Sequence, residues 1–273
     1  MAVFTGQYFS VARRRQVSFS VVLPVDVFGR QGKIEYVRGP FPTLYLLHGY
    51  SGNHTDWLYN GHVTELAAMH GIAVVMPEGD NSFYLNNGFS GEAYGDFIGR
   101  ELVDVTRRLF PLSALREETF IGGLSMGGFG ALRSGLYYND VFGAAFGLSS
   151  ALITDEVARM KPGQDNGVAP YAYYYNTFGD PAALLQSDRA PKTLAKMRRD
   201  AGEKLPRLFL ACGTEDFLYP ANLDMHECLK SLGIPHEWLT GPGVHDFKFW
   251  NYALPLALDW LKSGQNGTGK DAE

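Results

Sequence analysis

The residues that decide the fold are TFIGGLSMGGFGALRSGLYY, positions 119–138. The apolar run up to Leu124 is typical of a buried strand, and the small and apolar residues after Ser125 are typical of a closely packed helix. Strand and helix meet at Gly123-Leu124-Ser125-Met126-Gly127, which has the spacing G-x-S-x-G. In this context the serine lies on a sharp turn that exposes its hydroxyl, and Gly123 and Gly127 let the backbone pass without side-chain clashes. The sequence therefore predicts a nucleophile elbow at Ser125.

Alternating strands and helices surround this turn. Short apolar or β-rich runs predict strands over residues 43–47, 72–76, 119–124, 142–148, 207–212 and 236–239. Helical spacing predicts helices over residues 62–70, 94–110, 126–138, 221–232 and 249–262. This order predicts an α/β fold: a mostly parallel central sheet with helices on both faces and chemistry at the carboxyl ends of the strands. Two earlier β-rich runs, 16–23 and 34–37, are expected to be antiparallel strands at a sheet edge.

One domain is expected over residues 1–262, because a chain of 273 residues with 45% hydrophobic content can bury one large core. A Tyr- and Pro-rich stretch over about 154–204 is predicted to be a short cap-like insertion, and residues 263–273 have the composition of a disordered tail. The aromatic residues around 171–178 would suit a sugar, a phenolic acid or a contact between subunits. The sequence leaves these uses open, and with them the question of a homo-oligomer.

The charge pattern argues against nucleic acid as a partner. The formal net charge is -5, and the basic runs are Arg13 to Arg15 and Arg198-Arg199, interpreted as solvated faces. No stretch approaches the roughly 18 uninterrupted apolar residues that span a bilayer, so no membrane insertion is expected. The N-terminal residues do not resemble a secretory signal, which predicts a cytoplasmic protein.

The two cysteines are predicted to be packing residues. Cys212 lies in an apolar strand and Cys228 in the following helix, so a disulfide between them is not expected, which suits a reducing compartment. No His, Cys or Asp spacing indicates a metal site, and Glu78 and Asp80 are interpreted as loop caps.

A second group of residues is expected to stabilise an oxyanion. Acyl transfer places negative charge on the carbonyl oxygen, and one backbone N–H for it normally comes from a loop after an earlier strand. LLHGYSGNHTDW, residues 46–57, is that loop. The amides of Tyr50 and Met126 are the predicted donors, with Ser51 as the alternative to Tyr50. His48 is interpreted as a structural brace for the loop.

The base and the acid are predicted from chain order. In this architecture the base follows the nucleophile and the acid, and of the seven histidines only His245 lies late in the chain in a loop between a strand and a helix. Asp216 follows the strand that ends in Cys212 and is the predicted acid, which accepts the imidazole N–H. Glu215 is the competitor, and Asp246 is disfavoured because adjacent side chains rarely point at one ring.

Aromatic residues near these loops are expected to line an apolar acyl pocket. The candidates are Trp57, Phe83, Tyr84 and Phe89.

Motifs along almost the whole chain carry a resemblance. They are MAVFTGQYFS, VSFSVVLP, LLHGYSGNHTDW, MPEGDNSFYLN, GLSMGGFGALR, CGTEDFLY and GVHDFKFW. Together they resemble the putative esterase family of tributyrin esterases, which is similar in turn to esterase D or S-formylglutathione hydrolases and to the family-one carbohydrate esterases that act on feruloyl and acetyl esters. The resemblance implies an α/β-hydrolase fold, no cofactor, and a Ser, Asp, His order that falls on Ser125, Asp216 and His245.

The function expected from these observations is a serine carboxylesterase that hydrolyses short acyl esters, from acetyl to butyryl, with acetylated or feruloylated sugars among the candidate small-molecule substrates. One alternative is a thioesterase of the S-formylglutathione type, against which the segment HGYSGN counts. Others are a feruloyl esterase proper, an acyltransferase, and a non-catalytic binding module that kept the fold.

Overall fold

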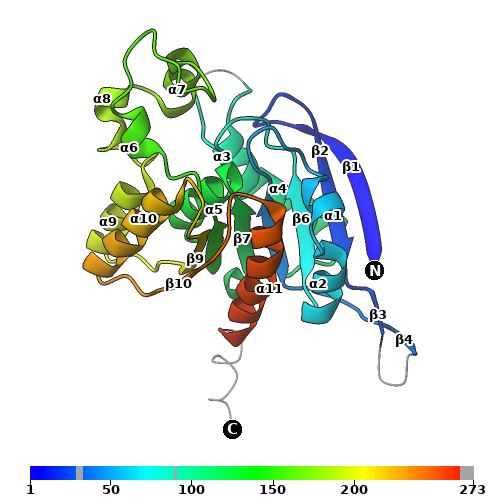
Figure 1. Cartoon of the computed structure of the whole chain (residues 1–273). Helices are drawn as coiled ribbons and strands as arrows, with labels where there is room; N and C mark the ends of the chain where they lie inside the picture. Colours follow the sequence, from blue (N-terminus) through cyan, green and yellow to red (C-terminus); the bar gives the residue numbers. More distant parts are fainter. Residues whose placement is uncertain (29–32, 89–90, 265–273) are drawn as a thin grey trace.

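The computed structural model describes residues 1–28, 33–88 and 91–264. Its centre is an eight-stranded sheet in the order β1-β2-β6-β5-β7-β8-β9-β10 (Figure 1). The strands are β1 (Ala2–Ser10), β2 (Arg15–Leu23), β5 (Thr43–Leu47), β6 (Ala73–Pro77), β7 (Thr119–Leu124), β8 (Ala144–Leu148), β9 (Arg207–Gly213) and β10 (His236–Gly241). Strands β5 to β10 are parallel, and β2 is antiparallel to both β1 and β6. The predicted mostly parallel sheet is confirmed.

Helices cover both faces of the sheet (Figure 1). One apolar cluster contains residues of α1 (Asp56–Asn60), α2 (Val63–His70) and α11 (Phe247–Ser263). The cluster on the other face contains residues of η2 (Phe97–Glu101), α4 (Leu102–Leu109), α5 (Met126–Tyr137), α9 (Pro191–Asp200) and α10 (Tyr219–Ser231). The helix predicted over residues 94–110 is one continuous run of α3 (Tyr94–Asp96), the π-helical η2 and α4. A short 3-10 turn, η3 (Arg116–Glu118), precedes β7.

The parallel strands bring their carboxyl ends to the same edge of the sheet. Leu47 at the end of β5 lies opposite Gly123 in β7, and Gly213 at the end of β9 lies opposite Gly241 in β10. Loops that are far apart in the sequence therefore meet above this edge.

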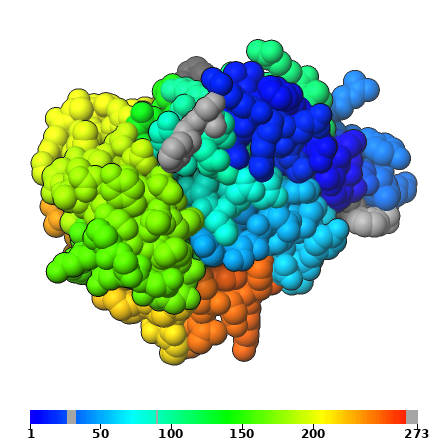
Figure 2. Space-filling model, turned by 90° about the horizontal axis from the view of Figure 1, so that it is seen from above, coloured from blue at the N-terminus to red at the C-terminus, as the bar shows by residue number. Residues whose placement is uncertain are grey.

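Three short helices lie above the same edge, between β8 and α9. They are α6 (Thr154–Val157), α7 (Tyr171–Phe178) and α8 (Pro181–Leu184). Helix α9 returns to the layer below by packing against α5 and α10. Seen from above, the chain of α6 to α8, coloured green, lies beside the cyan chain that follows β6 (Figure 2). The two segments are joined directly, because the Tyr173 hydroxyl donates to the Asn81 carbonyl oxygen at 2.6 Å and Arg189 donates to the Asn86 carbonyl oxygen at 2.7 Å.

Both of the earlier β-rich runs, 16–23 and 34–37, contain antiparallel strands, as predicted, but neither is the edge strand of the main sheet. Strand β2 is flanked on both sides, by β1 and β6, whereas β4 (Ile34–Tyr36) pairs with β3 (Asp26–Phe28) in a separate two-stranded sheet. The edge strand β1 shows no clean apolar alternation because most of its side chains are partly or fully exposed. All three residues of β4 are exposed, so no buried face fixes their pairing in the sequence.

Arg13 also differs from its predicted solvated position. Its side chain is buried against the ring of Tyr94, and it donates to the Asp80 carboxylate at 3.2 Å and to the Gly91 carbonyl oxygen at 2.9 Å. The opposite charge and the carbonyl oxygen compensate the guanidinium for its loss of water. Arg14 and Arg15 are exposed, as expected.

Both cysteines are free thiols, which confirms their predicted role as packing residues. Cys212 is buried in β9, where burial raises the pKa of its thiol to about 12, and Cys228 is partly buried on α10. No helix in the described ranges is long and apolar enough to cross a membrane.

Candidate active site

Ser125, His245 and Asp216 come together at the carboxyl edge of the sheet. The Ser125 Oγ lies 3.0 Å from the His245 Nε2, and the His245 Nδ1 lies 2.9 Å from the Asp216 Oδ2. Ser125 follows β7, Asp216 follows β9, and His245 lies in the loop between β10 and α11. This geometry lets the ring accept the serine proton at Nε2 while Nδ1–H donates to the carboxylate.

The environment of Asp216 keeps its carboxyl group charged. Burial alone would raise the pKa, but hydrogen bonds from the His245 ring and from the Leu218 amide, the latter at 2.8 Å, outweigh it. The pKa of Asp216 therefore lies below the ordinary value for an aspartic acid. An ionised carboxylate at this position stabilises the imidazolium that forms when His245 accepts a proton.

The two acids next to the candidate site have other partners. The Glu215 Oε2 accepts the Gly243 amide at 2.5 Å, which ties the end of β9 to the loop before His245. The Asp246 carboxylate accepts the Phe249 amide at 3.0 Å and caps the N-terminus of α11. Neither forms a hydrogen bond with His245 in the structure.

Ser125 has the backbone conformation of a strained turn. Its φ is 52° and its ψ is -119°, and such a positive φ is rare for a residue with a side chain. The Ser125 amide donates to the Leu148 carbonyl oxygen at 2.9 Å, and the Ser125 carbonyl oxygen accepts the amides of Phe129 and Ala151. These bonds to β8, to α5 and to the segment after β8 hold the turn and present the hydroxyl at the helix N-terminus.

Gly123 and Gly127 allow the elbow to pack closely on β5. A Cβ added at Gly127 would lie 2.5 Å from the carbonyl oxygens of both Leu47 and His48, and one added at Gly123 would lie 2.5 Å from the Gly127 carbonyl oxygen. All of these atoms belong to the backbone, which moves far less readily than a side chain.

We therefore expect Gly127→Ala to lower the free energy of unfolding by about 3 kcal/mol, or to prevent folding, because of this overpacking. Gly241→Ala is the matched control, since a Cβ there would meet nothing within 4 Å. Its free energy of unfolding should stay within about 1 kcal/mol of the unaltered protein. Urea unfolding measures both, and equal stabilities of the two variants would contradict the close approach.

The loop after β5, residues 48–52, lies against the elbow and is called the oxyanion loop below. A Cβ at Gly49 would lie 2.7 Å from the Leu124 side chain and 3.5 Å from the Ser125 Cβ. The Ser51 amide donates to the Asn81 Oδ1 at 2.7 Å, so this N–H is already engaged. Met126 is the first residue of α5, and its N–H has no acceptor within the helix.

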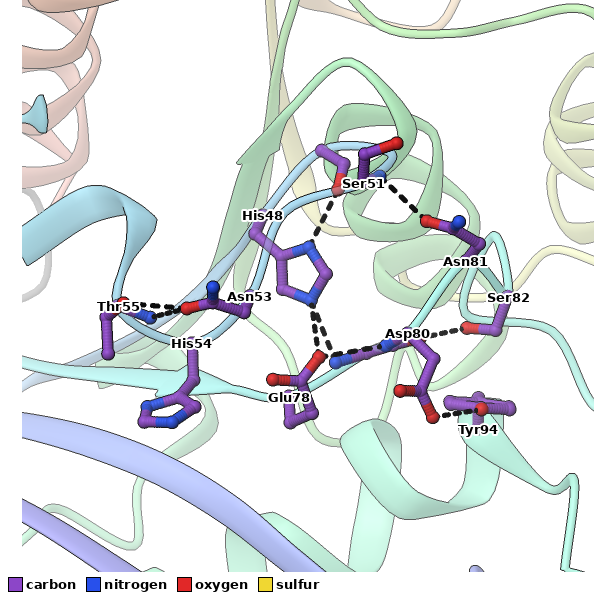
Figure 3. A network of polar contacts seen from close by, with 12 residues as sticks. His48, Ser51, Asn53, His54, Thr55, Glu78, Asp80, Asn81, Ser82 and Tyr94 are labelled. Carbon is purple, nitrogen blue, oxygen red and sulfur yellow. Dashed lines mark hydrogen bonds and ion pairs between the residues drawn. The ribbon is translucent and has the colours of Figure 1, made fainter. Parts of the chain in front are cut away.

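His48 braces this loop, as the sequence predicts. Its Nδ1 lies 2.7 Å from the Gly49 carbonyl oxygen, to which it can only donate. The Gly79 amide donates to the Nε2 at 2.9 Å, and the Glu78 Oε1 lies 3.5 Å from the same nitrogen (Figure 3). His48 is 1% exposed, so it is closed off from a substrate.

The family model described as "Putative esterase" matches residues 10–261. The chain belongs to this esterase family. It is a serine carboxylesterase, a hydrolase of carboxylic esters. The fold is the α/β-hydrolase fold that the sequence predicts.

Four known proteins are similar to this esterase, one of them in its fold alone. It is 39% identical over 262 residues to an acetyl esterase of Caldicellulosiruptor saccharolyticus, covering 96% of this chain and 98% of that protein. A substrate-bound fluorophosphonate-binding serine hydrolase of Staphylococcus aureus is 30% identical with a TM-score of 0.82, covering 95% and 98% of the two chains. The S-formylglutathione hydrolase of Staphylococcus aureus, as apoenzyme, is 29% identical with a TM-score of 0.80, again covering 95% of this chain and 98% of that one. A ferulic acid esterase, 23% identical with a TM-score of 0.74, shares the fold.

A pocket of about 760 Å³ opens at Ser125 and His245. Its apolar walls include Tyr50, Phe83, Met126, Leu152, Ile153 and Phe217. Charged side chains in and just after α6 complete the lining, namely Asp155, Glu156 and Arg159. The Phe217 ring lies 4.7 Å from the His245 ring and is 74% exposed. Sequence reasoning missed Phe217, although it directly follows the predicted acid.

Of the residues predicted to line the pocket, the structure places Phe83 in its wall and Trp57 and Tyr84 outside it. Trp57 is 1% exposed and donates its indole N–H to the Leu47 carbonyl oxygen at 3.0 Å. Tyr84 is fully buried and donates its hydroxyl to the His48 carbonyl oxygen at 3.0 Å. Through these bonds both aromatic side chains support the end of β5 and the start of the oxyanion loop. Phe89 lies outside the described residues.

Within the residues that the structure describes, no group of three or more His, Cys, Asp or Glu side chains is placed to hold a metal ion. The acidic residues Glu78 and Asp80 have structural partners. The Glu78 carboxylate accepts the Asp80 amide at 3.2 Å, which confirms Glu78 as a loop cap, and the Asp80 carboxylate binds Arg13 and Arg15.

Proposed function

We propose that Ser125 is the nucleophile, His245 the general base and Asp216 the residue that orients and stabilises the His245 ring. The observation that carries this proposal is the continuous pair of hydrogen bonds at 3.0 and 2.9 Å, located at the mouth of the pocket of about 760 Å³. The Tyr50 and Met126 amides are the proposed oxyanion donors. Ser51 is the weaker choice because its amide already donates to Asn81.

The reaction then follows in two steps. The Ser125 Oγ forms a bond to the ester carbonyl carbon while its proton passes to the His245 Nε2, and the carbonyl oxygen becomes an oxyanion. The bond to the alcohol oxygen breaks as His245 returns that proton to the alcohol, which leaves acyl-Ser125. Water repeats the sequence: it loses a proton to His245, adds to the acyl carbon and displaces the Ser125 Oγ, which regains the proton as the acid leaves.

We infer that the preferred substrates are short acyl esters of polar alcohols, acetyl esters first. The acetyl esterase relative supports the acyl group. The wall formed by Asp155, Glu156, Arg159 and Asn166 supports a hydroxylated alcohol, because such a group can hydrogen-bond to charged and amide side chains. Acetylated sugars are alcohols of this class.

A panel of esters tests this inference. We expect kcat/KM to be highest for acetyl to butyryl p-nitrophenyl esters and about tenfold or more lower for the octanoyl ester. An acetylated sugar should be hydrolysed with a lower KM than ethyl acetate, whose alcohol is apolar. A preference for octanoyl esters, or an equal KM for the two acetates, would contradict the assignment.

The similarity to an S-formylglutathione hydrolase supports a second candidate, a thioesterase. Its substrate carries a thiol leaving group on a charged peptide, which the charged wall of the pocket could also contact. Comparing kcat/KM for S-formylglutathione and for an acetylated sugar separates the two candidates, and a ratio above about 100 in favour of the thioester would establish the second.

A further inference from the structure

A second loop supports the oxyanion loop from the side of β6. In this loop, residues 78–84, the Gly79 amide donates to the His48 Nε2 and the Tyr84 hydroxyl donates to the His48 carbonyl oxygen. Further along, the Asn81 side chain accepts the Ser51 amide at 2.7 Å (Figure 3). The first two bonds hold the start of the oxyanion loop. The part after Tyr50 is held by the Asn81 bond from outside the loop and by a turn bond within it, from the Gly52 amide to the Gly49 carbonyl oxygen at 3.1 Å.

Ser51 needs such a partner because its backbone is strained. Its φ is 65°, a left-handed conformation that costs a non-glycine residue on the order of 1 kcal/mol. Ser51 is exposed, so packing does not impose this conformation. The Asn81 bond fixes the peptide group between Tyr50 and Ser51. The Tyr50 N–H belongs to the preceding peptide group, which is joined to it at the Tyr50 Cα and whose carbonyl oxygen, that of Gly49, is bonded to the His48 Nδ1 and the Gly52 amide.

The 78–84 loop is rigid enough to act as a support. Asp80 and Phe83 also have positive φ values, 44° and 50°. The Asp80 carboxylate receives hydrogen bonds from Arg13, from Arg15 at 2.8 Å and from the Tyr94 hydroxyl at 2.6 Å. These hydrogen bonds hold the strained backbone on either side of Asn81 and so hold Asn81 in place.

We propose that Asn81 is a positioning residue of this esterase: by holding the Ser51 amide, it aims the Tyr50 N–H at the carbonyl oxygen that becomes negative during acyl transfer. The inference rests on the proposed function of Ser125 and Tyr50. It adds a residue from a separate strand end that touches no reacting atom.

Helix α7 takes part in the same arrangement. The Tyr173 hydroxyl, from α7, donates to the carbonyl oxygen of Asn81 itself at 2.6 Å, and the Tyr173 ring meets the Tyr50 ring edge-on at 5.8 Å between centroids. Asn81 therefore joins α7 to the oxyanion loop. Its carbonyl oxygen accepts the Tyr173 hydroxyl, and its side chain accepts the Ser51 amide. The position of α7 contributes to the aim of the Tyr50 amide.

The proposal is tested by variants of Asn81 that have side chains of similar size but differ in whether they carry the oxygen that accepts the Ser51 amide. Asn81→Leu removes the acceptor, Asn81→Asp retains it, and Asn81 is exposed, so neither change opens a cavity. With p-nitrophenyl acetate we expect Asn81→Leu to lower kcat about 10- to 100-fold with KM within about threefold, since a displaced donor is lost mainly from the transition state. Asn81→Asp should recover kcat to within about threefold of the unaltered enzyme.

A second measurement separates positioning from damage to the fold. A trifluoromethyl ketone forms a tetrahedral adduct whose oxygen occupies the oxyanion hole, so its Ki should rise by the same factor as kcat/KM falls in Asn81→Leu. Tyr173→Phe removes only the hydroxyl bond to Asn81 and should lower kcat about two- to tenfold. Thermal unfolding checks that each variant is folded, and Asn81→Ala, judged by the same criteria, replaces Asn81→Leu if the latter does not fold.

Three results would overturn the proposal: kcat of folded Asn81→Leu within about twofold of the unaltered enzyme, Asn81→Asp as slow as Asn81→Leu, or an unchanged Ki for the ketone while kcat falls. Failure of the proposed function is a separate outcome. It would appear as full activity of a Ser125→Ala variant, or as no ester turnover by the unaltered enzyme.

Discussion

Ser125→Ala is expected to lower kcat toward p-nitrophenyl acetate by about 10⁶-fold. The hydroxyl lies 3.0 Å from the His245 Nε2, and without it no acyl-enzyme can form. The remaining turnover should come only from binding and from the oxyanion donors, which retain about 10³-fold or more over water in enzymes of this type. KM is expected to change little, because alanine leaves the walls of the pocket in place. Stopped assays at high enzyme concentration measure the residual rate.

A fluorophosphonate probe gives an independent readout of the same residue. The probe should label the unaltered enzyme at one site, in the peptide that contains Ser125, and should not label Ser125→Ala. Ser231→Ala, on the exposed end of α10, is the matched control and should keep both activity and labelling. Labelling of Ser125→Ala at the unaltered rate would assign the nucleophile to another serine.

Asp216→Asn is expected to lower kcat about 10⁴-fold. An asparagine amide at this position can present N–H to the His245 Nδ1, which favours the tautomer with the proton on Nε2, where it cannot accept the serine proton. The stabilising charge beside the imidazolium is lost as well. Because the pKa of Asp216 is lowered in the folded enzyme, its carboxylate stays ionised at neutral and mildly acidic pH. The defect should therefore be present across that whole range.

Glu215→Gln is the matched control for the acid, because it neutralises the neighbouring carboxylate. Glu215 is exposed and accepts the Gly243 amide, a bond that the glutamine oxygen can also accept. We expect kcat to remain within about threefold of the unaltered enzyme. A loss in Glu215→Gln as large as that in Asp216→Asn would mean that the two acids had been assigned the wrong way round.

Chain order and local context were sufficient to choose Ser125, Asp216 and His245 from the sequence. Each residue follows a strand that is recognisable from its own apolar run, and parallel strands must end at one edge of their sheet. The elbow is also a local signal, since Gly123 and Gly127 are required by backbone contacts within the turn and with the adjacent strand.

The residues that line the pocket were harder to predict from the sequence, because the direction in which a side chain points depends on contacts with segments elsewhere in the chain. Trp57 and Tyr84 are aromatic residues in the expected loops, yet both turn inward to hydrogen-bond the carbonyl oxygens of Leu47 and His48. Arg13 was misjudged for the same reason. Its compensating partner, Asp80, lies 67 residues further along the chain.

The sequence by itself determined the order of the parallel strands, the elbow at Ser125 and the family, because these depend on local patterns and on motifs that are contiguous in the chain. Only the tertiary structure decided which N–H group of the oxyanion loop is already engaged and which loop engages it. The Ser51 amide is engaged by Asn81, and Asn81 by Tyr173, so these contacts join two loops and helix α7. A shift of a few tenths of an ångström between segments far apart in the chain would weaken such contacts. No local pattern of residues encodes these distances.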